Sequence, residues 1–127
     1  MISFITSRFG VLEVSEDKII YFPEGIPGFT SIKRYILMDY KDTPLKWLQA
    51  VDDPDVAFIV VDPHLLNPDY KVFLDDFTKT IIKLTNDDDL VALVIIRREG
   101  DQVIANFNCP LLFNASNMRG VQVCLDT

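Results

Sequence analysis

The sequence is poor in the residues on which most enzymes depend. It has one histidine, one tryptophan and two cysteines in 127 residues. No apolar run approaches the roughly 20 residues that a membrane-spanning helix needs. The first residues also lack the basic region followed by a long apolar core that marks a secretory signal. We therefore expect a cytoplasmic protein that does not enter a membrane.

Cofactor and metal motifs are missing as well. The sequence contains no glycine-rich phosphate loop, no paired-cysteine metal motif and no His-Glu helix motif. Cys109 and Cys124 lie fifteen positions apart, a spacing typical of neither a metal site nor a disulfide-rich secreted domain. We expect these cysteines to be buried thiols, and the protein to bind neither a cofactor nor a metal ion.

The few candidate catalytic side chains do not form a recognisable set. His64 has no serine or cysteine signature near it, and general acid–base catalysis needs a second positioned group. The alternative is a divalent-metal-dependent hydrolase that uses Asp52, Asp53 and Asp62. Adjacent aspartates on a strand point to opposite faces, and Pro54 indicates a turn instead. We therefore expect a structural or surface role for His64 and no catalysis.

The negative charge is concentrated in one part of the chain. Between Asp39 and Asp89 there are twelve aspartates and five lysines, a net charge of −7, whereas the remaining residues are neutral overall. A surface of this sign repels phosphate and favours basic partners, so direct binding to nucleic acid is not expected. The segment is either a docking face or a solubilising surface.

The pattern of apolar residues predicts a mainly β protein with a single domain over residues 1–127. Short β-branched or aromatic segments between turn signals are typical of an all-β core, and many short strands need their edges hidden. We expect a small antiparallel β-barrel-like fold or a tight sandwich. The expected strands in the first half are Gly10 to Val14, Lys18 to Phe22, Tyr35 to Asp39, Trp47 to Val51 and Val56 to Val61.

The second half is expected to add a hairpin, a final strand and one short helix. Leu90 to Arg97 is a continuous apolar run, and Glu99, Gly100 and Asp101 supply a tight turn into the next strand, whose buried face would hold Val103, Ala105 and Phe107. Val121, Val123 and Leu125 alternate with other residues as a strand would. The helix is indicated by Leu74, Phe77, Ile81 and Leu84, which recur at helical spacing.

The segment from Phe22 to Phe29 predicts a tightly specified turn. Two aromatic residues bracket two prolines and two glycines within eight residues, a composition that neither a helix nor a central strand accepts. Such a turn either caps the core as a rigid loop or presents a binding site.

Trp47 is the other candidate for a binding role. In an extended strand Trp47, Gln49 and Val51 share one face, and a glutamine there indicates a face that is not wholly core. Tryptophan is enriched among interface hot spots, but a lone tryptophan in a small domain is more often part of the core.

Taken in order, these motifs resemble the flagellar assembly factor FliW family. The resemblance extends over nearly the whole chain. It rests on Phe22 to Phe29, Trp47 to Gln49, Ala57 to Pro63, Pro68 to Tyr70, Asn106 to Asn114, and Gly120 to Val123.

The resemblance implies a non-catalytic cytoplasmic protein with two protein partners. It implies binding to newly made flagellin and, when flagellin is depleted, binding to the translational repressor CsrA, which relieves repression of flagellin translation. Flagellin's polymerising ends, as the family implies, are amphipathic helices, and an apolar groove rimmed by polar groups is the usual way to receive one.

The expected partner contacts come from two kinds of residue. An apolar groove is expected among Phe29, Trp47, Phe107, Pro110 and Phe113, with Gln49 and Asn114 beside it. Core membership is the competing expectation for each of these apolar residues except Phe29. The acidic residues Asp52, Asp53 and Asp55 are the expected contacts for basic CsrA, because a turn beside the strand of Trp47 joins an apolar anchor to charge.

Overall fold

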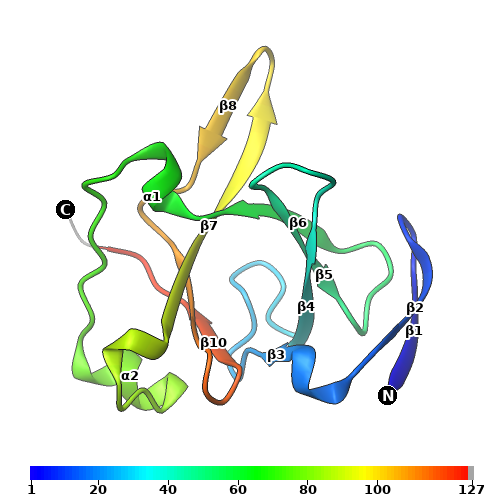
Figure 1. Cartoon of the computed structure of the whole chain (residues 1–127), viewed down its shortest axis with the longest axis horizontal. Coiled ribbons are helices and arrows are strands. Elements are labelled where there is room, and N and C mark those ends of the chain that lie inside the picture. The colour runs from blue at the N-terminus through cyan, green and yellow to red at the C-terminus, as the bar shows by residue number, and fades with distance from the viewer. Residues whose placement is uncertain (126–127) are drawn as a thin grey trace.

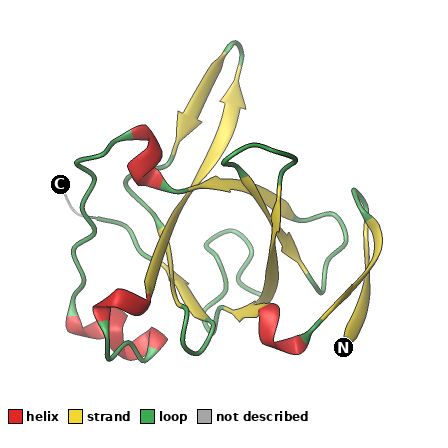
Figure 2. Ribbon diagram, in the orientation of Figure 1, coloured by secondary structure: helices red, strands yellow, loops and turns green. Residues whose placement is uncertain are grey.

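Seven strands close into a β-barrel in the computed structural model, which describes residues 1–125. The hydrogen-bonded order is β6-β5-β4-β3-β10-β9-β7, and an additional pairing between β6 and β7 closes the ring. Every pairing is antiparallel except that of β3 with β10, which is parallel and joins Tyr21 to Arg119. Figure 1 looks into this ring, and Figure 2 shows that most of the regular secondary structure is strand.

The strands of the barrel are β3 (Ile19–Tyr21), β4 (Arg34–Asp39), β5 (Lys46–Ala50), β6 (Ala57–Val61), β7 (Leu90–Glu99), β9 (Leu111–Asn114) and β10 (Arg119–Gln122). Two further strands, β1 (Ile2–Thr6) and β2 (Gly10–Val14), form a separate hairpin, and β8 (Gln102–Ala105) pairs with the end of β7. The mainly β, barrel-like fold that the sequence predicts is therefore confirmed. The predicted single domain also takes in Asp126 and Thr127, which lie outside the described residues.

The hairpin of β7 and β8 is confirmed, but its buried face was wrongly assigned. The distal part of β7 extends beyond the ring with β8 as a two-stranded arm (Figure 1). Val103, expected to be buried, has 69% of its surface exposed, because no other element covers the arm at that position. The predicted final strand is also too long, since β10 ends at Gln122 and the residues from Val123 to Leu125 are not in a strand.

The sequence reading missed β1 and β9. β9 is wholly buried and lies between β7 and β10, so apolar and polar side chains do not alternate along it. A strand covered on both faces lacks the period of two on which strand prediction depends.

The turn from Phe22 to Phe29 plugs one end of the barrel and so caps the core, which is one of the two roles expected of it; the other, presenting a binding site, stays a prediction. The pale blue loop of residues 22–33 lies within the outline of the ring in Figure 1. Phe22 and Ile26 are both 2% exposed and belong to the main core cluster. Gly25 has a φ of +68°, and a Cβ there would lie 2.6 Å from the backbone of Thr30. Only glycine fits this position without strain. We call this end of the barrel the closed end.

The N-terminal hairpin covers part of the outside of the barrel. Phe4 packs in a small buried cluster with Ile36 of β4 and Val51 at the end of β5. Inside the barrel Tyr35 of β4 is fully buried, and this burial raises the pKa of its hydroxyl to about 12. β4 is therefore covered on both faces, which accounts for its uninterrupted apolar run.

The two α-helices are short and sit outside the ring. α1 (Pro63–Leu66), which was not expected, begins where Pro63 follows the capping residue Asp62. α2 (Asp76–Ile82) is the predicted helix, although its buried residues are Thr78 and Ile82, and Phe77 is 70% exposed. Two single 3-10 turns, η1 (Glu16–Lys18) and η2 (Asp87–Asp89), precede β3 and β7. No helix among residues 1–125 has the length and hydropathy needed to cross a membrane.

Candidate functional site

A shallow groove runs from the closed end of the barrel to the arm. It consists of two adjoining hollows of about 650 Å³ and about 280 Å³, which share Ile95 of β7 and Asn106. The larger hollow lies against β8 and reaches Phe107, whereas the smaller lies between Phe58 of β6 and Pro27 of the plugging turn. We call these two hollows the closed-end groove. Its lining combines apolar and amide side chains with one charged group, the guanidinium of Arg97, and carries no carboxylate.

The structure places one expected partner contact, Phe107, in the lining of this groove and a second, Phe29, beside it on Phe58 of the lining. Phe29 is 38% exposed and packs edge to face on Phe58, with ring centroids 5.3 Å apart. Phe107 lines the larger hollow and packs against Tyr70, whose hydroxyl donates a 2.7 Å hydrogen bond to the carbonyl of Phe107. Burial raises the pKa of that Tyr70 hydroxyl.

Three other expected contacts are not available at the surface. Pro110 and Phe113 are buried, and Phe113 belongs to the barrel core. Asn114 is 1% exposed, and its side-chain amide donates hydrogen bonds to the carbonyls of Ile82 and Lys83 at the end of α2. The prediction of a single groove lined by five apolar residues was therefore wrong, because the side chains of β9 point into the protein on both faces of the strand.

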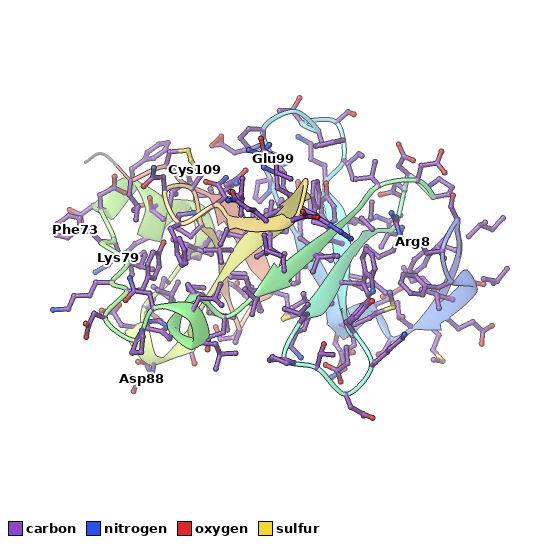
Figure 3. All side chains as sticks on the ribbon, turned by 90° about the horizontal axis from the view of Figure 1, so that it is seen from above. Arg8, Phe73, Lys79, Asp88, Glu99 and Cys109 are labelled. Carbon is purple, nitrogen blue, oxygen red and sulfur yellow. A yellow bond between two sulfur atoms is a disulfide. The ribbon has the colours of Figure 1, made fainter. Side chains whose placement is uncertain are left out.

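A disulfide, rather than two buried thiols, closes one side of the groove. Cys109 and Cys124 are bonded to each other, and both line the smaller hollow. Cys124 is exposed. Backbone hydrogen bonds from Val123 to Pro110 and from Leu125 to Asn108 hold the same two segments together. Spacing alone could not reveal this pairing, because it depends on how the segment after β10 folds back beside residues 108–110. Figure 3 marks Cys109 and draws the bond.

Trp47 lies on a different surface, next to the tip of the N-terminal hairpin. Its ring contacts Phe9 at 5.8 Å and Tyr40 at 5.7 Å between centroids, and the guanidinium of Arg8 lies 4.8 Å from the ring centre. Figure 3 places Arg8 at the end of the molecule opposite Phe73. The sequence reading did not identify Phe9 and Arg8, whose partnership with Trp47 depends on the hairpin folding over β5.

The same hairpin tip also contacts the aspartates that follow β5. The backbone N–H of Ser7 donates to the carbonyl of Pro54 at 2.9 Å, and the hydroxyl of Ser7 donates to the carboxylate of Asp55. Asp52, Asp53 and Asp55 lie in a turn, as Pro54 indicates. We call residues 52–55 the acidic turn. The hairpin tip therefore joins Trp47 and the acidic turn into one surface.

Gln49 is part of the interior, contrary to the expectation drawn from it. Its side chain is fully buried, and its amide donates to the carbonyls of Ala50 at 3.0 Å and Val56 at 3.2 Å. The backbone of the turn that leads into β6 satisfies the side-chain nitrogen of Gln49, whereas its buried side-chain oxygen has no hydrogen-bond partner among the described residues. Gln49 therefore does not mark a solvent-facing side of β5.

One member of the acidic turn is already paired. The guanidinium of Arg34 donates two hydrogen bonds to the carboxylate of Asp52, at 2.9 Å and 2.5 Å, in a bidentate contact. The hydrogen bond from Arg34 holds the pKa of the Asp52 carboxyl below its usual range, and the same contact raises the pKa of Arg34. Asp53 and Asp55 make no ion pair within residues 1–125.

The carboxylates of the hydrolase alternative are not brought together. Asp52 and Asp53 precede β6, whereas Asp62 follows it, so the length of the strand, about 17 Å, separates them. Asp62 caps α1 and lies 3.1 Å from the Nδ1 atom of the exposed His64. In the described part of the chain no three side chains of histidine, cysteine, aspartate or glutamate gather in a way that would hold a metal ion.

Comparison with known proteins identifies one family. The family model described as FliW protein matches residues 3–127. A flagellar assembly factor FliW from Caldanaerobacter subterraneus subsp. tengcongensis is 38% identical over 125 residues, which cover 95% of this chain and 83% of the relative. The protein of the same name from Treponema denticola is 36% identical over 123 residues, covering 95% of this chain and 84% of the relative.

A solved structure has the same fold. The chain in a structure described as the crystal structure of the flagellar assembly factor FliW superposes with a TM-score of 0.92 and is 33% identical in sequence. The superposition covers 98% of this chain and 89% of the other.

Proposed function

Since this chain belongs to the FliW family of flagellar assembly factors, we propose that it binds flagellin in the cytoplasm and, when free of flagellin, binds and antagonises the translational repressor CsrA. Relief of repression would then let flagellin translation follow flagellin demand. The protein acts as a single domain and catalyses no reaction. The family match over almost the entire chain is the observation that carries this proposal.

The closed-end groove is the surface that we assign to flagellin. A groove with apolar walls and a polar rim suits one face of an amphipathic helix. Phe29 offers a partly exposed aromatic side chain beside Phe58 of the lining, and Asn106 and Asn108 offer amide groups along it. The one charged side chain of the lining, Arg97, is exposed and paired with Glu99 at 3.3 Å, so an apolar helix face can enter without meeting a buried charge.

The surface made by Trp47 and the acidic turn is the one that we assign to CsrA. Asp53 and Asp55 give this surface a negative charge without an ion-pair partner within residues 1–125. Carboxylates of this kind attract a basic protein and repel RNA that approaches the same site. At physiological salt the Debye length is about 8 Å, so the repulsion acts only if these residues dock beside the RNA path.

Binding measurements with the purified proteins test the proposal. We expect the tagged chain to retain flagellin and CsrA, each from a solution of that protein alone, and to release repression of a flagellin transcript in a translation reaction that contains CsrA. Failure to bind either protein would refute the proposed function. Hydrolysis of a small substrate that depends on one ionisable residue would refute the absence of catalysis.

Two phenylalanines provide a test residue and a matched control for locating the flagellin-binding site. Phe29 and Phe9 are 38% and 37% exposed, and each packs edge to face on one other aromatic ring. We expect Phe29→Ala to weaken flagellin binding at least tenfold, which corresponds to about 1.4 kcal/mol, and Phe9→Ala to leave it nearly unchanged. The reverse result would move the flagellin site to the surface of Trp47.

Two groups of three aspartates provide a test variant and a matched control for locating the CsrA site. Replacing Asp52, Asp53 and Asp55 by asparagine removes the same charge as replacing Asp87, Asp88 and Asp89 in η2. We expect the first variant to slow association with CsrA and to flatten its salt dependence, whereas the second leaves both unchanged. Equal effects from the two variants would indicate attraction by net charge alone and would contradict a site at the acidic turn.

A further inference from the structure

One edge of β7 is open where β6 ends. β6 pairs with β7 only at Val94, Ile95 and Ile96, whereas β9 pairs with the opposite edge from Leu90 to Leu93. The antiparallel register, continued by two residues, would set Pro63 opposite Ala92. Proline has no N–H to donate, and the carbonyl of Pro63 already accepts from the backbone of Asn67 at 2.9 Å within α1. The ladder between β6 and β7 therefore stops before Ala92.

The backbone groups of Ala92 face this open edge. The carbonyls of Asp89 and Ile95 accept hydrogen bonds from Ala115 and Asn106, which lie on the side of β9 and β8. In an antiparallel ladder, successive residues direct their N–H and C=O groups to opposite edges. The N–H and C=O of Ala92 accordingly point away from β9, and within residues 1–125 no strand pairs with them there.

A hollow of about 690 Å³ lies along this edge. It is bounded by β7 from Leu90 to Leu93 and by the segment of Tyr70, Lys71 and Val72. The part of β7 that lines the hollow, from Leu90 to Leu93, is about 13 Å long, enough for three or four residues of an extended chain. We call this hollow the edge groove. It shares no lining residue with the closed-end groove.

The charge of the edge groove is opposite to that of the whole chain. The chain carries a net charge of −7, whereas the lining of this hollow contains Lys46 and Lys71 against the single carboxylate of Asp62. Lys46 is paired with Asp39 at 2.6 Å. Lys71 is exposed and makes no ion pair within the described residues, so an acidic group that enters the groove meets an available cation.

We propose that the edge groove binds a short, extended, acidic peptide segment of a partner protein, which adds to β7 as a further strand. The main-chain groups of the peptide pair with Ala92, and an acidic side chain contacts Lys71. Main-chain pairing of this kind supplies affinity, and the side chains on either face supply specificity. The site is separate from both surfaces assigned above and does not depend on them.

The two other possible occupants fit less well. A second copy of this chain brings a net charge of −7 to a molecule of the same charge, which opposes association. A small free anion contacts the lysines but leaves the N–H and C=O groups of Ala92 without a partner. An extended acidic peptide satisfies both requirements.

A library of hexapeptides with blocked termini, screened for binding to the protein, tests the proposal. The binding site of each selected peptide is then located from the NMR signals of the protein's backbone amides. We expect selected peptides to alternate apolar and acidic residues and to shift the amide signals of Ala92, Lys71 and His64. Methylation of alternate peptide-bond nitrogens should abolish binding of a selected peptide, because it removes the donors that a strand needs. Binding of the methylated peptide with equal affinity would overturn strand addition.

A charge reversal with a matched control tests the acidic preference. We expect Lys71→Glu to weaken the selected peptide about tenfold and Lys18→Glu, a change at an exposed lysine of η1, to leave it unchanged. Equal loss in both variants would overturn the proposed contact with Lys71. A library that yields no binder, signal shifts outside the edge groove, displacement by free glutamate at the same concentration, or self-association as the only response would each overturn the proposal.

Discussion

The closed end of the barrel and the acidic turn are both loops beside aromatic rings, but they differ in what holds them. At the closed end, Phe22 and Ile26 are buried in the core and a glycine is required where the backbone comes closest to Thr30. The acidic turn is held by a few polar contacts at the surface, from Arg34 to Asp52 and from Ser7 to Asp55. Substitutions among the buried residues of the plugging turn should therefore change stability, whereas those in the acidic turn should change binding.

The largest effect is expected at Gly25. A Cβ at Gly25 would lie 2.6 Å from the Cα and carbonyl oxygen of Thr30, and the backbone there has a φ of +68°. We expect Gly25→Ala to lower the free energy of unfolding by about 2–4 kcal/mol, because strain and overpacking act together. Urea denaturation measures this loss.

Gly28→Ala is the matched control for this prediction. Gly28 has a φ of +90° but open space around its Cβ position, so only the backbone term applies and the loss should be about 1–2 kcal/mol. Equal losses for the two variants would contradict the close packing of the plugging turn.

The disulfide at the closed-end groove should have the next largest effect. It links residues 15 positions apart, and closing a loop of that length removes conformational entropy worth about 3 kcal/mol from the unfolded chain. We expect replacement of Cys109 and Cys124 by serine to lower the stability of the oxidised protein by about that amount. In the presence of dithiothreitol the wild type and the variant should unfold at nearly the same urea concentration. A wild type that is insensitive to the reductant would contradict this prediction.

A substitution at Gly120 of β10 tests how tightly Phe22 of the plugging turn packs against this strand. A Cβ at Gly120 would lie 2.8 Å from two ring atoms of Phe22, a side chain that can shift. We expect Gly120→Ala to cost about 1–3 kcal/mol of stability. In the double variant with Phe22→Leu the loss should be smaller than the sum of the two single losses, because the smaller side chain leaves room for the methyl group. Additive losses would show that the two residues do not compete for space.

The smallest effect is expected at the ion pair of the acidic turn. The pKa of Asp52 is lowered in the folded protein, so its contribution is present above the unfolded carboxyl pKa of roughly 3.9 and is lost as the pH falls through the lower folded value. Because its side chain is 48% exposed, we expect Asp52→Asn to cost less than about 1 kcal/mol at neutral pH.

Thermal unfolding across a pH series checks this last prediction. The difference between wild type and Asp52→Asn should shrink toward zero as the pH is lowered below the folded pKa of Asp52. A difference that persists in acid would mean that the carboxylate charge is not its source, and the contrast with the closed end would then be weaker than proposed.

Sequence patterns predicted the parts of the fold that depend on local chemistry. The turn from Phe22 to Phe29 could be recognised because proline and glycine restrict the backbone whatever surrounds them. The hairpin of β7 and β8 could be recognised from the residues Glu99, Gly100 and Asp101 at its turn. Buried strands such as β9 could not, because burial on both faces removes the alternation that identifies a strand.

The candidate sites were predicted less well than the fold. Phe107 lines the closed-end groove and Phe29 packs beside it on Phe58, but Phe113 and Asn114 are interior, since an aromatic or amide side chain suits either a core or a surface. Phe58, Ile95 and Asn106 complete the groove but were not among the predicted contacts. Their roles arise from adjacency across β6, β7 and the plugging turn.

By itself, the sequence determined the mainly β architecture, the position of the plugging turn, the acidic segment and the likeness to one family. These properties follow from backbone restriction, periodicity and composition, which act over short stretches of chain. Only the tertiary structure decided that Cys109 meets Cys124, that Phe9 meets Trp47, and that Pro63 leaves the edge of β7 open beside Lys71. Each of these depends on how distant segments are placed around a closed ring, and that placement is set by packing and pairing across the whole chain.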